Sequence, residues 1–359
     1  MITRFFYLSM AICACLLFFP PVVSAVELGE GIVLDPLTGD YTVTYLVGLD
    51  DGSKLLQKTR FEPATKIISS VQSKFHLGET GTVAYRYSVS SSTQSRQILS
   101  TFRFDPVANV IGSQDLPTNR ATVTEAQLSA VFDANRAALA TPSGWSGAIF
   151  PGRSGGFRIS WNPVDPKAGI QPGSSLKGFG FSSQALPGLG TVELQGRRKW
   201  RTTYAGDGPQ GDISQQFDAL RLKDFVTRPA AIPTIAVPDP FDPAVTLERI
   251  QAHMHTWIAM QLLDPAFSSQ LDRSFQSAIS AYRLNQPKVG KQQLEAMRVL
   301  IKKEHADADK EDDQDDRGEK GEDDDKARNK RVLINKLAAR ILDFDLKYET
   351  KRMGGDKDD

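Results

Sequence analysis

The chain has 359 residues, 40% of them hydrophobic, and a formal net charge of zero at pH 7. This length accommodates one large or two ordinary domains with a real core, and the balanced charge gives no overall attraction to nucleic acid. Both cysteines lie near the N-terminus, at Cys13 and Cys15. Cysteine nucleophiles and cysteine-ligated zinc are therefore excluded from the rest of the chain.

Residues 1–25 have the pattern of a signal peptide. Arg4 precedes the uncharged apolar run Phe5–Phe19, and Val23-Ser-Ala25 is a small-residue cleavage site. The pattern predicts cleavage after Ala25 and a secreted, periplasmic or cell-surface protein with no transmembrane span after cleavage. A membrane helix needs about 20 apolar residues, so a retained anchor is the less favoured alternative.

Residues 26–228 carry strand signals. Apolar and polar residues alternate over Tyr41–Val47, Val83–Val89 and Ile98–Phe104, with turn residues between these segments. This pattern predicts an antiparallel β-sandwich. A helical pattern at about 122–139 predicts a helical insertion within it.

The stretch 161–188 ends the strand-rich region. Its turns are marked by Pro-Gly pairs, and Phe179 and Phe181 are two residues apart, so they share one face of a strand. We expect both phenylalanines in the core. We expect Gly178 and Gly180 where the backbone turns or approaches a neighbour closely.

The C-terminal part of the sequence, from about residue 245, has a helical pattern. Five prolines predict an extended linker over 229–244, and apolar stripes at helical spacing predict a small bundle over 245–352. An acidic loop at 306–328 interrupts the bundle; its segment 307–325 has 12 acidic and three basic residues among 19. Such a segment is predicted to be disordered, and so is the tail at 353–359. The fold class is thus a multidomain β + α protein.

Two parts of the sequence resemble known modules. The segment 75–200 resembles uncharacterised secreted bacterial proteins with an extracellular, fibronectin-like β-sandwich. The residues that carry this resemblance are Tyr85-Arg-Tyr-Ser-Val89, Gln97-Ile98, Phe102, Pro142-Ser-Gly-Trp145, Ile159-Ser-Trp161, Ile170 to Phe179 and Leu186-Pro-Gly188. The tail resembles the FIMAH-type helical module through Phe275 to Ile279, Leu294 to Met297 and Leu337 to Ile341, apart from its acidic insertion. Both resemblances imply architecture and an extracellular address, and no catalytic residue.

No motif specifies a reaction. The string Gly152-Arg-Ser-Gly-Gly156 matches a serine nucleophile elbow, but a strand pattern follows it where a helix is required, so we interpret it as a hairpin turn. His253 and His255 are two apart on a predicted helix and point about 200° apart. They are unsuited to chelating one ion. The sequence therefore names no catalytic, cofactor-binding or metal-binding residue.

Two charged segments are candidate ligand sites. Asp313, Asp315 and Asp324 match three positions of an EF-hand-like calcium loop. Arg317 and Lys320 do not fit that loop, so diffuse cation binding and a solvated spacer are the favoured alternatives. The basic cluster Arg197–Arg201, which contains Trp200, would suit an anionic polysaccharide or nucleic acid. The favoured alternative is a strand end whose Trp200 packs while its charges stay in water, and a third is attraction to the acidic loop of the same or another molecule.

We therefore expect a non-enzymatic, exported bacterial protein that works as an extracellular or cell-surface binding or structural module. Its expected partners are a cell-surface polysaccharide or another extracellular protein, not nucleic acid, and no cofactor is expected. The alternatives are a secreted polymer-degrading hydrolase with unidentified carboxylates and a calcium-responsive surface module.

Overall fold

The computed structural model describes residues 29–78, 81–115, 123–152, 156–305 and 333–353. The chain forms two compact units, each built from two separate stretches. Unit 1 contains Met1–Pro63 and Arg198–Asp224, and unit 2 contains Ala64–Arg197 and Phe225–Asp359. The predicted signal peptide, the acidic loop and most of the C-terminal tail lie outside the described residues.

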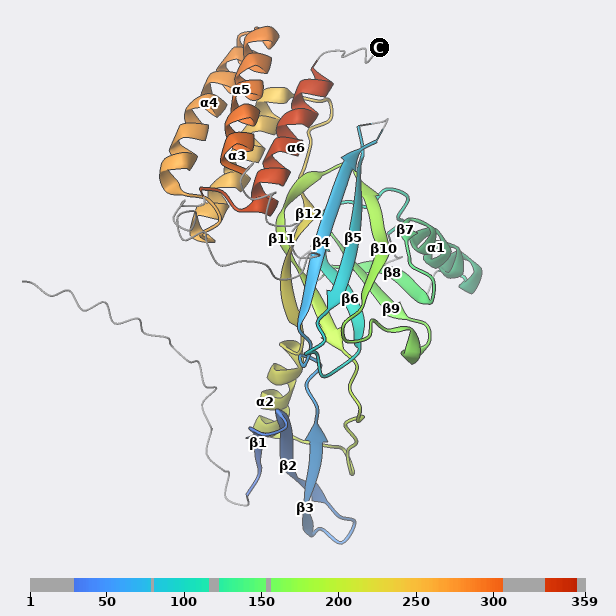
Figure 1. Cartoon of the computed structure of the whole chain (residues 1–359). Coiled ribbons are helices and arrows are strands. Elements are labelled where there is room, and N and C mark those ends of the chain that lie inside the picture. The colour runs from blue at the N-terminus through green and yellow to red at the C-terminus, as the bar shows by residue number, and fades with distance from the viewer. Residues whose placement is uncertain (1–28, 79–80, 116–122, 153–155, 306–332, 354–359) are drawn as a thin grey trace, which may run out of the picture. The chain divides into compact units, whose positions relative to one another are not determined.

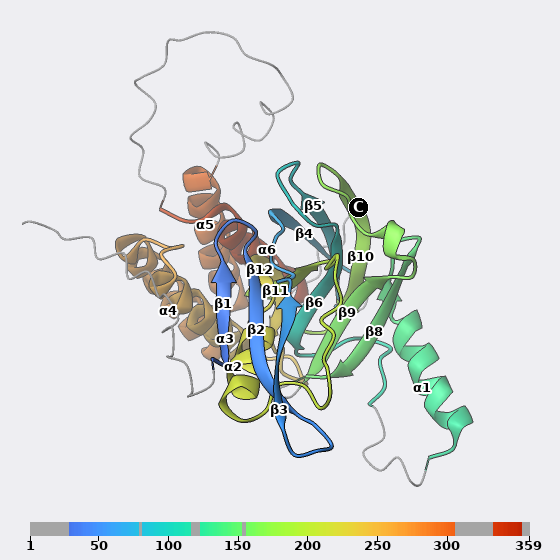
Figure 2. The ribbon, with the colours of Figure 1, turned by 90° about the horizontal axis from the view of Figure 1, so that it is seen from below.

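Unit 1 is a small antiparallel sheet covered by one helix (Figure 2). The strands β1 (Gly31–Asp35), β2 (Asp40–Gly48) and β3 (Lys54–Phe61) lie in that order, and the helix is α2 (Gly211–Leu222). Alternation along the strands sends one set of apolar side chains toward α2. The resulting core consists of Val43, Tyr45, Phe61, Ile213 and Phe217.

Unit 2 contains two antiparallel sheets that pack face to face (Figure 1). The first sheet has the order β4 (Ser69–Leu77), β5 (Val83–Ser91), β10 (Ser175–Ser183), β7 (Leu139–Ala140). The second has the order β12 (Val226–Ile235), β11 (Leu186–Gly196), β6 (Leu99–Val107), β9 (Phe157–Pro163), β8 (Trp145–Pro151). The short 3-10 helix η2 (Pro166–Ala168) follows β9. This arrangement confirms the predicted β-sandwich.

Aromatic side chains fill the space between the two sheets. The Phe102 ring lies 5.2 Å from Phe179 and 5.5 Å from Trp161, and the Phe104 ring lies 5.7 Å from Phe181. All five side chains are 1% exposed or less. The predicted burial of Phe179 and Phe181 is therefore confirmed.

A side chain is disfavoured at each of the two glycines Gly178 and Gly180 of β10, for a different reason at each. Gly178 has φ of +103° at a register shift between Lys177 and Phe179, a conformation that disfavours side chains. A Cβ added to Gly180 would lie 2.3 Å from the backbone oxygen of Tyr85. The expected close approach is thus present at Gly180, whereas Gly178 lies at a bulge within the strand and not at a turn.

The helical insertion is α1 (Glu125–Ala137), which lies between β6 and β7. Thr124 and Gln127 form a capping box at its start, which fixes where the helix begins. The insertion predicted at about 122–139 is thus confirmed as a helix.

The helical part of unit 2 is an array of four helices (Figure 1). These are α3 (Pro243–Ala259), α4 (Pro265–Arg283), α5 (Pro287–His305) and α6 (Lys336–Arg352). Their apolar faces join the aromatic core of the sandwich in one hydrophobic cluster, and the Phe344 ring of α6 lies 5.0 Å from that of Phe75 on β4. In the described residues, no helix is sufficiently long and apolar to cross a bilayer.

The expected linker over 229–244 is wrong for its first half, because Val226–Ile235 forms strand β12. This strand lies at the end of its sheet, where Pro229 and Pro233 are opposite Thr191 and Pro187 of β11. A proline lacks the N–H that a central strand donates, but an edge strand needs hydrogen bonds on one side only.

The expected single β domain over 26–228 is divided in the structure. Strands β1, β2 and β3 pack on α2 in unit 1 and belong to neither sheet of the sandwich. Alternation in the sequence shows that a strand has one buried face, but the same pattern arises whichever partner covers that face.

Candidate binding surface

The candidate site lies in unit 1, on the side of β3 that faces away from α2. Strand pairing places Lys58 opposite Thr44 and Arg60 opposite Thr42, whereas Phe61, in the alternate register, packs in the helix-covered core. Both basic side chains are exposed. The alternation that buries Phe61 thus presents two cations on the open face.

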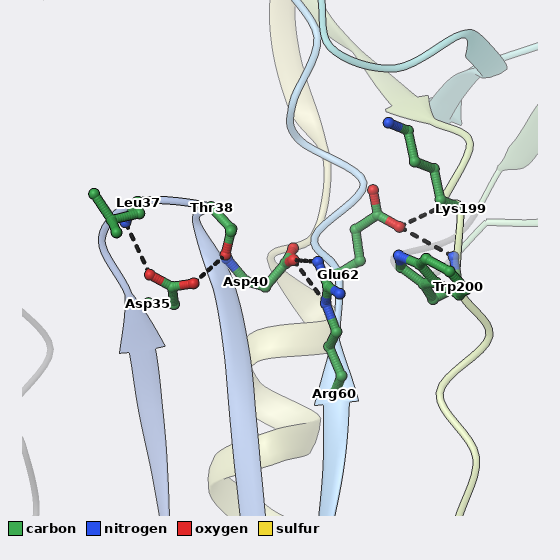
Figure 3. Close-up of polar contacts among 8 residues, drawn as sticks. All are labelled: Asp35, Leu37, Thr38, Asp40, Arg60, Glu62, Lys199 and Trp200. Carbon is green, nitrogen blue, oxygen red and sulfur yellow. Dashed lines mark hydrogen bonds and ion pairs between the residues drawn. The ribbon is translucent and has the colours of Figure 1, made fainter.

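Glu62 fixes the position of the basic cluster. Its carboxylate accepts the backbone N–H of Lys199 at 2.5 Å and that of Trp200 at 3.1 Å (Figure 3). The residue is only 4% exposed. A buried carboxylate that holds two consecutive N–H groups keeps this segment beside the end of β3.

Arg198 has a structural role within the cluster. Its Nε donates to the backbone oxygen of Glu62 at 2.8 Å, and its guanidinium pairs with the buried Asp224 and lies 5.1 Å from the Phe61 ring centre. All residues of the cluster are exposed, but Arg198 is held by Glu62 and Asp224.

Trp200 is the exposed aromatic of this surface, with 57% of the residue accessible. The Arg60 guanidinium lies 5.8 Å from the centre of its ring. The sequence-based alternative that Trp200 packs against the protein is therefore wrong, because most of its side chain is open to solvent.

We define the Trp200 surface as the lining of a shallow hollow of about 290 Å³. Its residues are Lys58, Thr59, Arg60, Trp200, Arg201 and Thr203. A second hollow of about 410 Å³ shares Lys58, Thr59 and Arg60 and adds Asp35, Thr38, Asp40 and Thr42. Together the two hollows follow the open face of the sheet past the end of β3.

The second hollow carries carboxylates as well as cations. Thr38 donates its hydroxyl to Asp35 at 2.6 Å and the N–H of Leu37 donates at 2.9 Å (Figure 3), which lowers the pKa of Asp35, with a smaller contribution from the Arg60 charge. Asp40 pairs with Arg60. A carboxyl whose pKa is lowered is a poor proton donor at neutral pH, so Asp35 is unsuited to general acid catalysis.

The histidines named from the sequence are not brought together. His253 Nε2 accepts the N–H of Leu189 at 2.9 Å, whereas His255 Nε2 lies 2.7 Å from a carboxylate oxygen of Asp272. Among the described residues, no three histidine, cysteine or acidic side chains are grouped to hold a metal ion. The candidate calcium residues Asp313, Asp315 and Asp324 lie outside the described residues.

The serine-elbow string also lies partly outside the described residues, since 153–155 are not placed. The strands on either side are described: β8 and β9 are antiparallel, with Pro151 opposite Phe157, and the Gly152 N–H donates to the Gly156 oxygen at 2.9 Å. Two strands face each other across this string, which is the hairpin that the sequence predicted.

The chain matches no protein-family model, and no curated protein matches it. A comparison with solved structures finds an uncharacterised protein from Nocardia farcinica, described as having an immunoglobulin-like fold. The two share 14% identity with a TM-score of 0.24, over 46% of this chain and 99% of that one.

Sequence reasoning found the cluster Arg197–Arg201 but missed the residues that complete the surface. Lys58 and Arg60 are two residues apart in β3, so a strand there would have placed both cations on one face. Glu62 gave no signal, because its two N–H donors are 137 and 138 residues away in the sequence.

Proposed function

We propose that the protein is an exported binding module whose Trp200 surface binds an anionic polysaccharide. The observation that carries this proposal is an exposed tryptophan on a fixed backbone, with basic side chains around it. The flat face of an indole packs against the apolar face of a sugar ring, and lysine and arginine bind carboxylate or sulfate groups.

Two further features support this proposal. The N-terminal pattern predicts export, which would bring the surface to where extracellular polymers occur. The hollows are shallow and open along a strand, a shape that suits an extended chain more than an enclosed small molecule.

The test is affinity for polysaccharides of known charge, measured by calorimetry with the chain from residue 26. We use polygalacturonate and heparin as anionic probes and dextran as the neutral probe. The proposal expects binding of at least one anionic probe, weakening with added salt, and no binding of dextran. Turnover of a probe would support the hydrolase alternative and overturn a purely binding role.

Variants locate the surface. Trp200→Ala is expected to weaken binding about tenfold through loss of the stacking contact, whereas Met260→Ala, which removes a 54% exposed apolar side chain from unit 2, leaves affinity unchanged. Lys58→Ala is expected to weaken binding and reduce its salt dependence. Lys54→Ala, on the same strand outside the hollows, is the matched control. Equal affinities for Trp200→Ala and the native chain would overturn the proposal, and so would tighter binding of double-stranded DNA than of either polysaccharide.

A further inference from the structure

Helix α6 buries two carboxyl groups one turn apart. Asp345 is 1% exposed and Glu349 is fully buried. Among the described residues, none of their four carboxyl oxygens has a hydrogen-bond partner. A buried carboxylate without partners is costly, and its neutral form costs far less.

The groups around Asp345 do not compensate a negative charge. Tyr85 of β5 is its titratable neighbour in the sandwich, and the Tyr85 hydroxyl already donates to the Ala185 backbone oxygen at 2.9 Å. Arg298 of α5 forms an ion pair with Asp343 at 2.9 Å. Asp343 is two residues before Asp345 and points about 200° away from it around the helix. This arginine therefore pairs with Asp343 and not with Asp345.

Glu349 has a cation nearby but no ion pair with it. Arg352 is close enough to lower the pKa of Glu349, yet its guanidinium lies 4.8 Å from the Phe241 ring centre and no bond joins it to the carboxyl. Asp242, at the start of α3, adds a second negative charge. Tyr282 of α4 and Tyr348 of α6 also lie within reach of the Glu349 charge, and the buried Tyr282 hydroxyl has no partner among the described residues.

These surroundings set the direction of titration. Burial, and then the Glu349 charge, raises the pKa of Asp345 far above its ordinary value. Burial also raises the pKa of Glu349, and Asp242 adds to this against the opposing effect of Arg352. Packed α6 therefore holds more protons than an exposed α6 holds at the same pH.

We propose that α6 is a proton-dependent latch: it packs against α5, β11 and α3 only while Asp345 and Glu349 are uncharged, and their ionisation releases it. Because both groups titrate higher when packed, packing is most stable below the ordinary carboxyl range near pH 4. It weakens as pH rises through the raised values. This inference concerns unit 2 and is independent of the proposed ligand.

The test is amide hydrogen exchange of the full chain between pH 5 and 9, with rates corrected for intrinsic exchange. If α6 is such a latch, protection of the amides of 336–352 should fall as pH rises, by up to about tenfold per pH unit for each carboxyl, relative to the amides of β6. Asp345→Asn and Glu349→Gln, singly and together, should flatten this dependence, since amides do not ionise.

Asp343→Asn is the matched control, because Asp343 is on the same helix, paired with Arg298 and more exposed. It should keep the native pH dependence. The single variants preserve the test if the double variant fails to fold. A pH-independent α6, an equal slope in the amide variants, or a simultaneous loss of protection in β6 would each overturn the latch.

Discussion

His253 Nε2 accepts a hydrogen bond from the backbone N–H of Leu189 at 2.9 Å, and this bond ties α3 to β11. The bond requires the neutral imidazole, and burial lowers the pKa of His253 below its ordinary 6.5. A lowered folded-state pKa gives stability that is complete above 6.5 and is lost as pH falls toward the lowered value. The free energy of unfolding should therefore fall by up to about 1.4 kcal/mol per pH unit in this range.

The measurement is denaturant unfolding from pH 7 to pH 5 for the native chain and His253→Gln, since glutamine offers an acceptor that does not titrate. Taking the difference between the two curves cancels the contribution of Asp345 and Glu349. His255→Gln, which changes an exposed histidine on the same helix, is the control. Parallel curves for the native chain and His253→Gln would contradict the prediction.

Gly180→Ala should destabilise unit 2. Its Cβ would lie 2.3 Å from the backbone oxygen of Tyr85, and backbone cannot move aside as a flexible side chain can. Overpacking of this kind costs about 1–3 kcal/mol or more. Gly48→Ala meets no atom within 4 Å at the end of β2 and should be close to neutral. Thermal unfolding of both variants tests this difference, and equal melting temperatures would count against the close approach.

Phe179→Ala should remove about 3–5 kcal/mol from the free energy of unfolding of the sandwich. The Phe179 ring is fully buried and lies 5.1 Å from Trp145 and 5.2 Å from Phe102. Lys177→Ala, an exposed change on the same strand, should cost less than about 0.5 kcal/mol. Denaturant titration followed by tryptophan fluorescence measures both, and similar midpoints would argue against the aromatic core.

Glu62→Ala should loosen the basic cluster. Removing the carboxylate leaves the N–H groups of Lys199 and Trp200 without their acceptor, at a cost of about 1–3 kcal/mol. Trypsin should then cut after Lys199 about tenfold faster. Glu30→Ala is the matched control, because Glu30 accepts the Leu46 N–H at 2.7 Å elsewhere in unit 1. Faster cutting in the control alone would contradict the role of Glu62.

The elements that could be predicted from the sequence are those whose pattern of residues is compatible with only one type of secondary structure. Phe179 and Phe181 belong to a strand because they are two apart between turns, and α5 begins at Pro287 because proline suits a first helical turn. These signals are local, since each depends on residues within one or two turns of the chain.

The remaining features depend on contacts between distant parts of the chain. The prolines from 229 onward predict an extended linker, and only pairing with β11 makes Val226–Ile235 a strand. Helical spacing places Asp345 and Glu349 on the apolar side of α6 with Ile341, Leu342 and Leu346. That neither carboxyl group has a hydrogen-bond partner among the described residues depends on how the other elements pack around α6. Lys58, Arg60 and Trp200 meet because Glu62 joins segments more than 130 residues apart.

The discontinuous course of unit 1 has a consequence for its folding during synthesis. Strands β1, β2 and β3 emerge from the ribosome long before α2, and the Tyr45 hydroxyl accepts the N–H of a residue 160 positions later, Ala205. Until then Val43, Tyr45 and Phe61 have no helix to cover them. The first-made part of the protein is therefore completed late, after the chain of nearly the whole sandwich has been made, and its exposed sheet needs protection from pairing with other nascent chains.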